Sequence, residues 1–264
     1  MSGVSSPVAV VTATHLVRVP VTTVWSAPGS PRAVDEAMVR EVPDATAWLA
    51  ALDANPGDDE AGDGRLGLHG RVETQLLEDE PVVVVGTDAS GAWAEVVAPW
   101  QLSPKDERGY PGWVPAAHLA PVPDGRTVTA PQATEPASAG EDATHPAVVE
   151  ARRHLGLPYL WCGITPLGFD CSGLVLHTWR LLGVVVARDA YAQADFATPV
   201  PLDAVRPGDL YFFAHPGRRI HHVGIVVRPG RMVHASETGG ALVEEDLPPA
   251  RVATLVAAGR LPMP

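Results

Sequence analysis

Short runs of apolar, β-branched residues alternate with turn residues over residues 12–119, in segments such as EPVVVVGTD, GAWAEVVAPW and GYPGWVPAAHL. This alternation predicts a small antiparallel β-barrel. Apolar residues recur at helical spacing within it, over residues 32–52, and the following NPGDDEAGDG consists of turn formers and acids. The pattern therefore predicts an all-β domain over residues 1–120, with a helical insertion over about residues 32–66.

The pattern changes after residue 120. Residues 121–146 are rich in Pro, Ala, Thr and Gly and contain almost no large apolar side chain, so we expect an interdomain linker. Beyond it, residues 147–155 and 170–182 have helical character, and residues 209–213, 222–227 and 231–234 are typical of strands. This order, helix first and sheet after, predicts an α+β domain over residues 147–264.

Cys171 lies at the start of the second predicted helix, where DCSG precedes the apolar run LVLHTWRLL. Asp170 then lies near the N-cap and Cys171 in the first turn, beside backbone N–H groups that no helical carbonyl accepts. We expect these groups and the helix dipole to lower the pKa of the thiol and to bind an oxyanion. A cysteine beside an apolar helix is most often a small buried hydrophobe, so catalysis requires partners.

Two histidines supply candidate partners in IHHVGIVVRPGRMVHASE, where two apolar runs flank the turn signal RPGR. A hairpin folded at this turn places His222 roughly opposite His234 on one face, so that one imidazole can act as a base and the other can orient it. His221 should point to the opposite face as a structural or solvent-facing residue. We expect His154, His177 and His215 to be surface or satisfied core residues.

Composition restricts the class of partner. The chain has 264 residues, 46% of them hydrophobic, and a formal charge of -12, which argues against nucleic acid and anionic membranes. Its two cysteines form no CxxC pair and no zinc-type cluster, so we expect no disulfide framework, no metal and no cofactor. The amino terminus lacks the features of a secretory leader, so we expect a cytoplasmic protein, or an extracellular one if a leader was removed. We also expect a monomer.

Four motifs in order, PYLWCGITPLGFDCSGLV, RPGDLYFF, HHVGIVV and MVHAS, resemble the NlpC family of bacterial cell-wall peptidases over residues 159–235. These are papain-like enzymes with a Cys-His-His catalytic set. The resemblance implies that Cys171 is the nucleophile, His222 the base and His234 the residue that orients the base. It also implies that Tyr159 supports the oxyanion and that Trp161 lines the substrate site.

In members that cut γ-D-glutamyl bonds, the residues flanking the nucleophile, here Asp170 and Ser172, contact the D-glutamate backbone. Cys162 departs from the family, because it stands in the usual Trp-Gly-Gly run; we expect it to narrow the cleft or to pack, without a catalytic role.

The amino-terminal half resembles bacterial SH3-like domains, most clearly at ETQLLEDEPVVVV, GAWAEV and DERGYPGWVPAAHL. Together with RDAYAQ, this arrangement resembles the subgroup that cleaves murein peptides beginning with a free L-alanine. In that subgroup a Glu and a Tyr of the SH3-like domain help to recognise the amino group. The resemblance implies this role for Tyr110 and for Glu73, with Glu80 as the alternative acid. Asp189 matches a cleft aspartate that would pair with the substrate ammonium.

The expected reaction is hydrolysis of the γ-D-glutamyl–diaminopimelate or γ-D-glutamyl–lysine bond through a thioester at Cys171, in recycled murein peptides. Two alternatives remain open at this point. One is amide hydrolysis or acyl transfer on another substrate by the same fold. The other is a protein that binds wall peptides without cleaving them, although the intact Cys171, His222 and His234 argue against it.

Overall fold

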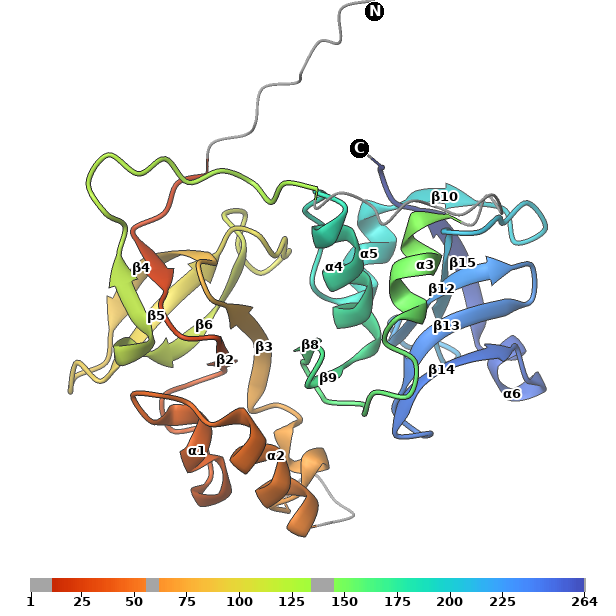
Figure 1. Cartoon of the computed structure of the whole chain (residues 1–264). Coiled ribbons are helices and arrows are strands. Elements are labelled where there is room, and N and C mark those ends of the chain that lie inside the picture. The colour runs from red at the N-terminus through yellow and green to blue at the C-terminus, as the bar shows by residue number, and fades with distance from the viewer. Residues whose placement is uncertain (1–10, 56–61, 134–144, 264) are drawn as a thin grey trace, which may run out of the picture.

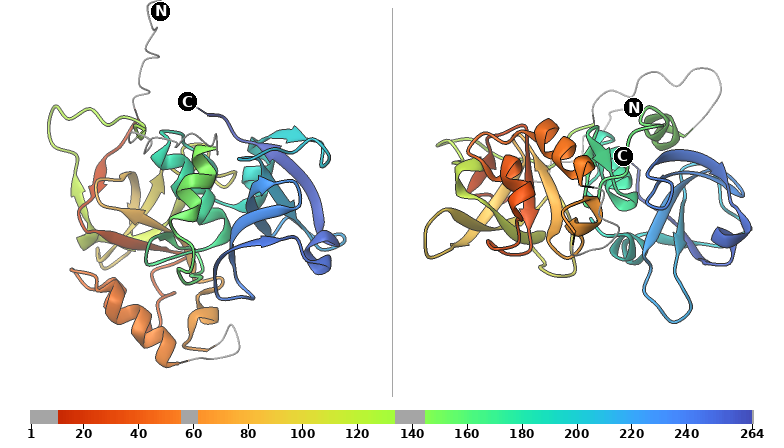
Figure 2. Two further views of the ribbon diagram at one scale, coloured as in Figure 1. Left: turned by 45° about the vertical axis from the view of Figure 1, so that its right-hand side comes forward. Right: turned by 90° about the horizontal axis from the view of Figure 1, so that it is seen from below.

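A computed structural model describes residues 11–55, 62–133 and 145–263. Figure 1 shows two β-rich bodies, with helix α4 (Cys171–Leu181) between the first sheet and the second. The turned views of Figure 2 show the amino-terminal strands and the carboxy-terminal strands on opposite sides of this helix. The mixed α and β content confirms the predicted α+β class.

The amino-terminal half is built around one seven-stranded sheet in the order β3-β2-β6-β5-β4-β1-β7, with antiparallel neighbours. Its apolar alternation fills a core that includes Val24, Leu76 and Val96, all with no exposed surface. The strands of this sheet are β1 (His15–Val17), β2 (Val21–Trp25), β3 (Val72–Leu77), β4 (Pro81–Thr87), β5 (Trp93–Ala98), β6 (Tyr110–Pro115) and β7 (Leu119–Pro121).

The predicted helical insertion is present, but the single helical stretch expected over residues 32–52 is wrong. The structure has a 3-10 turn (Ala33–Asp35), a short α1 (Glu36–Val39) and a separate α2 (Ala45–Ala54). The chain is extended at Arg40, and Pro43 cannot donate a backbone hydrogen bond, so the first helix stops. Asp44 then caps α2 by accepting a 2.9 Å hydrogen bond from the backbone N–H of Ala47.

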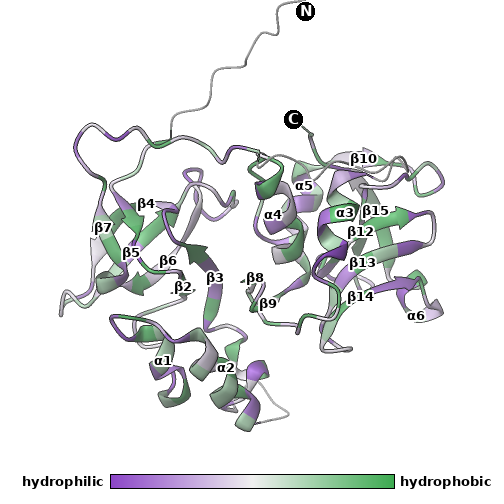
Figure 3. Ribbon diagram, viewed as in Figure 1, coloured by the Kyte–Doolittle hydropathy of each residue, from purple (hydrophilic) through white to green (hydrophobic). Residues whose placement is uncertain are grey.

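The carboxy-terminal half contains a six-stranded sheet in the order β10-β15-β11-β12-β13-β14. Helix α4 packs on it through a core that includes Leu174, Val175 and Ile225, none of which is exposed. Figure 3 shows hydrophobic residues in β15 of this sheet and in β4 of the first. The remaining elements are α3 (Pro146–Arg152), β8 (Ile164–Thr165), β9 (Gly168–Phe169), α5 (Ala190–Phe196), β10 (Thr198–Val200), β11 (Leu210–Phe213), β12 (His222–Arg228), β13 (Arg231–Ser236), β14 (Ala241–Asp246), α6 (Pro249–Val252) and β15 (Leu255–Arg260).

Residues 121–133 of the predicted linker run beside the amino-terminal half, where the backbone N–H of Val11 donates to the carbonyl of Val128 at 2.9 Å. Residues 134–144 of that linker, residues 1–10 and residues 56–61 of the insertion lie outside the described residues. Within the described ranges, every helix is too short or too polar to cross a bilayer.

Buried polar contacts join the two halves. Glu80, which is fully buried, accepts two hydrogen bonds from Arg180 on α4, at 2.8 and 2.9 Å. The side chain of Gln75 on β3 accepts a 3.2 Å hydrogen bond from the backbone N–H of Ile164. The paired, charge-assisted contact between Glu80 and Arg180 is strongly orientation-dependent, so it helps to fix how the halves dock.

Candidate active site

A cleft of about 640 Å³ lies between the two halves. Its wall includes Tyr110 and Glu73 from the first half, and Cys171, His222 and Asp189 from the second. A cavity of this size suits a short peptide rather than a single amino acid. The candidate residues, which are far apart in the sequence, therefore face a common space.

The nucleophile candidate stands at the head of α4. Cys171 is the first residue of the helix, and Asp170 is its N-cap, accepting a 2.5 Å hydrogen bond from the backbone N–H of Gly173. The backbone N–H of a first-turn residue has no partner within the helix. The predicted placement of the thiol in the first turn of a helix is therefore present.

The expectation of a lowered thiol pKa is wrong. Burial, with 8% of Cys171 exposed, and the negative charge of Asp170 raise the pKa of Cys171 to about 12. Hydrogen bonds from the backbone N–H groups of Val223 and Ser172 lower the pKa, but less than burial raises it. In the free protein this group is a thiol and needs a base.

His222 and His234 share one face of the β12–β13 hairpin, as predicted. The hairpin pairs Ile225 with Val233, which places His234 beside Gly224, so the two histidines are diagonal rather than opposite neighbours. His222 Nε2 lies 2.9 Å from His234 Nδ1, and their ring planes are inclined at 85°. The pair is buried, with 6% of His222 and none of His234 exposed.

Glu245 on β14 extends this pair into a chain of three groups, which sequence reasoning missed. Its Oε1 lies 3.1 Å from His234 Nε2, and Arg251 holds the same oxygen from the other side at 3.1 Å. A carboxylate can only accept, so His234 Nε2 carries a proton and His234 Nδ1 is an acceptor. Nε2 of His222 then donates to it, which leaves Nδ1 of His222 with the lone pair that a base requires.

Burial, and the proximity of His234 and Arg251, hold the pKa of His222 well below its ordinary value. The pKa of His234 is lowered to about 4, again mainly by burial. The resting site thus holds a neutral Cys171 thiol and a neutral His222 imidazole, which both line the cleft. Such a pair suits proton transfer from thiol to imidazole during attack on a carbonyl, as in serine hydrolases, rather than a thiolate formed in advance.

Arg188 organises the residues that flank the nucleophile and was also missed. This side chain is 1% exposed, and its two terminal nitrogens lie 2.7 and 3.2 Å from the Asp170 carboxylate. It donates to Ser172 at 2.9 Å and, from Nε, to Thr74 of the first half at 2.7 Å. Asp170 and Ser172 line the cleft, but their side chains are held in this network. Arg188 is the first residue of the RDAYAQ motif, in which the sequence assigned a role only to Asp189.

Tyr159 and Trp161 both line the cleft. Burial and the nearby Cys171 and Asp170 raise the pKa of Tyr159, so its hydroxyl stays protonated and can donate. Trp161 packs against His69, with ring centroids 3.8 Å apart.

One end of the cleft is anionic and belongs to both halves. The Tyr110 hydroxyl lies 3.2 Å from the carboxylates of Glu73 and Asp189. The ammonium of Lys105 contacts Glu73 and lies 2.9 Å from the same hydroxyl. Glu80, the alternative acid, is buried against Arg180 and is absent from the described lining of this cleft. The structure therefore brings together Tyr110, Glu73 and Asp189 and leaves Glu80 elsewhere.

The remaining candidates lie at the edges. His221 is exposed, and its ring stacks on that of His215 with centroids 4.7 Å apart, beside the cleft. Cys162 is 5% exposed and adopts a positive φ of 61°. Its thiol donates to the Val72 carbonyl at 3.0 Å, and burial raises its pKa well above the ordinary value. Cys162 packs between the halves and also forms part of the cleft wall, so both placements expected for it are observed.

Comparison with known proteins agrees with this geometry. Residues 156–252 match the family model described as NlpC/P60 family. A γ-D-glutamyl-L-lysine dipeptidyl-peptidase of Bacillus subtilis (strain 168) is 32% identical over 86% of this chain and 92% of its own length. A protein of the same name from Bacillus cereus is 25% identical over 81% of this chain and 80% of its own length.

The fold is also found in a solved structure. The crystal structure of an NlpC/P60 family protein from Bacillus cereus has a TM-score of 0.77, covering 96% of this chain and 100% of its own, at 24% identity. At that level of identity the similarity concerns the fold alone. The Bacillus subtilis relative, at 32% identity, covers most of both chains. The chain therefore belongs to the NlpC/P60 family of cysteine peptidases.

Proposed function

We propose that this protein hydrolyses the γ-D-glutamyl–diamino acid bond of short murein peptides whose amino-terminal L-alanine is free. The relatives that span most of the chain are named as dipeptidyl-peptidases for γ-D-glutamyl-L-lysine, and such enzymes measure two residues from an amino terminus. The observation that carries the proposal is the anionic part of the cleft wall, built from Tyr110, Glu73 and Asp189.

This part of the wall suits an ammonium group. Two carboxylates flank one hydroxyl, and the charged amine of Lys105 already lies among them. A substrate ammonium offers the same charge and hydrogen-bond donors as Lys105. Other parts of the lining are cationic, with Arg219 over the ring of Tyr191 and Arg251 nearby, and these suit the carboxylates of a murein peptide.

In the proposed reaction, the Cys171 sulfur attacks the γ-carbonyl of D-glutamate as Nδ1 of His222 takes the thiol proton. The backbone N–H of Cys171 and the Tyr159 hydroxyl donate to the resulting oxyanion. His222 then gives its proton to the leaving amine, and a thioester remains on Cys171. Water, deprotonated by His222, hydrolyses the thioester and restores the thiol. His234 orients His222 throughout.

The test compares L-Ala-γ-D-Glu-L-Lys with its N-acetylated form. Wild-type protein should release L-Ala-D-Glu from the free peptide, the Cys171→Ala variant should not, and N-acetylation should lower kcat/KM. Cys162→Ala is the matched control for loss of a thiol and should retain activity. No cleavage of either peptide contradicts the peptidase proposal, and equal cleavage of both contradicts recognition of the amine.

A further inference from the structure

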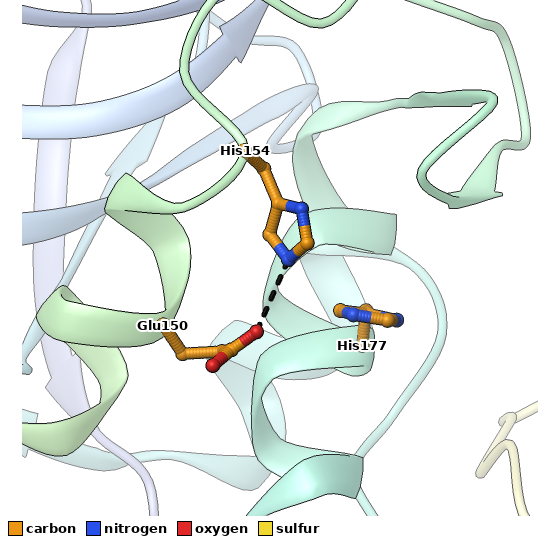
Figure 4. A group of neighbouring side chains, drawn as sticks. All are labelled: Glu150, His154 and His177. Carbon is orange, nitrogen blue, oxygen red and sulfur yellow. Dashed lines mark hydrogen bonds and ion pairs between the residues drawn. The ribbon is translucent and has the colours of Figure 1, made fainter. Parts of the chain in front are cut away.

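A second cluster of ionisable side chains lies where α3 meets α4, among residues that do not line the cleft. Figure 4 shows Glu150 and His154 facing each other, with the ring of His177 beside them; Glu150 lies on α3, His154 just after its end, and His177 on α4. One ligand-type atom from each residue lies within 4.8 Å of those of the other two. The peptidase chemistry uses none of these groups.

The ring of His177 is held beside that of His154. The two ring centroids lie 5.1 Å apart, with their planes inclined at 80°. One ring nitrogen of His177 interacts with the carbonyl of Ile164, which fixes the ring and leaves the other nitrogen free for a ligand. Metal-binding histidines are commonly held by a backbone carbonyl in this way.

Glu150 supplies an oriented carboxylate. Its Oε1 lies 3.2 Å from His154 Nε2, and its Oε2 accepts a 2.7 Å hydrogen bond from Arg153. The Arg153 contact holds one oxygen and leaves the other directed at the histidines. The side chains of His154 and Glu150 are 12% and 14% exposed, so an ion can reach them from solvent.

The floor of the cluster is apolar. The Phe169 ring, which is fully buried, packs against His154 and His177 with centroid distances of 4.9 and 5.1 Å. An apolar shell around converging ligands excludes competing water and strengthens the attraction for a cation.

We propose that Glu150, His154 and His177 form a binding site for one divalent transition-metal ion of the Zn²⁺ type, with water completing its coordination. Two imidazoles and a carboxylate suit Zn²⁺ and not Mg²⁺, which prefers oxygen ligands alone. Bonds of about 2.0–2.1 Å in a tetrahedral site place ligand atoms about 3.3 Å apart, so the side chains close in by rotation. The ion takes the place of the proton shared by His154 and Glu150.

This ion cross-links α3 to α4. Helix α4 begins with Cys171, and α3 is the first helix after the segment that connects the two halves. The site therefore stabilises the scaffold that carries the nucleophile. No zinc-type spacing is visible in the sequence, because two ligands come from a Glu-x3-His pair and the third lies 23 positions beyond it, on another helix.

The experiment titrates the metal-free full-length protein with Zn²⁺, and in parallel with Mg²⁺, by calorimetry and thermal unfolding. It uses the Cys171→Ala background, because Cys171 and the cleft histidines are themselves capable of binding Zn²⁺. One Zn²⁺ should bind per chain and raise Tm in a saturable way, whereas Mg²⁺ should do neither. His154→Gln and Glu150→Gln should each weaken binding more than about 100-fold, since loss of even an outer partner costs about 10–100-fold.

His15→Gln, a histidine on β1 of the other sheet, is the matched control and should bind as the parent does. The Tm of each variant, measured without metal, shows whether that variant is folded. If His154→Gln is unstable, Glu150→Gln still tests the proposal, because glutamine keeps the shape of the glutamate side chain. Zinc binding that is absent from the Cys171→Ala background, or that survives both substitutions, overturns the proposal. The proposed peptidase activity is measured separately, on protein with Cys171 intact, so neither outcome of the zinc titration decides it.

Discussion

Glu245 offers a sharp test of the hydrogen-bonded chain behind His222. Glu245→Gln keeps the shape of the side chain and removes its charge. We expect the change to impair formation of the His222 imidazolium, because the carboxylate stabilises positive charge on the pair and sets the tautomer of His234. It should therefore lower kcat/KM for the free peptide without altering recognition of the amine.

The size of the effect follows from the geometry. The rings of His222 and His234 are 4.9 Å apart, and Glu245 Oε1 lies 3.1 Å from His234 Nε2. The charge is thus roughly 8 Å from the imidazolium, which gives about 2 kcal/mol at an effective dielectric constant near 20. The Glu245 side chain is 36% exposed, and solvent screening reduces this to about 1 kcal/mol. The expected loss in kcat/KM is about fivefold.

The neighbouring Glu244→Gln is the matched control. Glu244 carries the same charge, but it pairs with Arg152 and Arg231. The assay is steady-state cleavage of L-Ala-γ-D-Glu-L-Lys between pH 5 and 9, together with the rate of Cys171 alkylation. If Glu245→Gln lowers activity no more than Glu244→Gln does across this pH range, the hydrogen bonds from Glu245 through His234 do not influence His222.

Three further results are expected. Lys105→Met should lower KM for the free peptide several-fold with little change in kcat, because the lysine ammonium no longer competes with the substrate ammonium for Glu73. Arg188→Met should lower the free energy of unfolding by about 3–5 kcal/mol in urea titrations, because it leaves the buried Asp170 carboxylate without its partner. The free energy of unfolding of the metal-free protein should decrease as the pH falls from about 6.5 towards 4, because His177 is protonated in the unfolded chain before it is protonated in the folded chain, where its pKa is about 4. His177→Gln should make this decrease in stability smaller.

Each of these results has a contrary outcome. A raised KM in Lys105→Met would mean that the lysine binds substrate instead of competing with it. Unchanged urea stability in Arg188→Met would mean that water solvates the Asp170 carboxylate. Stability that does not change between pH 6.5 and 4, with the metal chelated, would contradict the lowered pKa of His177.

Much of the fold and the centre of the site could be predicted from the sequence, because both depend on local patterns. Alternating apolar residues define the strands, and the motifs around Cys171, His222 and His234 each lie on one element or hairpin. The break at Pro43 was missed because helical spacing continues through it. The pKa of Cys171 was mispredicted because a helix start is visible in sequence, whereas the depth of burial is not.

The missed residues depend on pairings between distant segments. Glu245 lies in an acidic run, which in sequence resembles any solvated strand end. Arg188 contacts both Thr74 and Asp170, residues 114 and 18 positions away. Lys105 is a lysine in a loop until the fold brings it beside Glu73. Such roles emerge only when the topology is known.

The contacts between the two halves have a consequence for how this enzyme can be rearranged. Three hydrogen-bonded contacts have one partner in each half: Glu80 with Arg180, Thr74 with Arg188, and Val72 with Cys162. An exchange of the amino-terminal half for that of another family member would leave a buried arginine or glutamate unpaired unless the partners were transplanted together. The two halves therefore form a structurally matched pair, and chimeras should be cut along these contacts rather than at the linker.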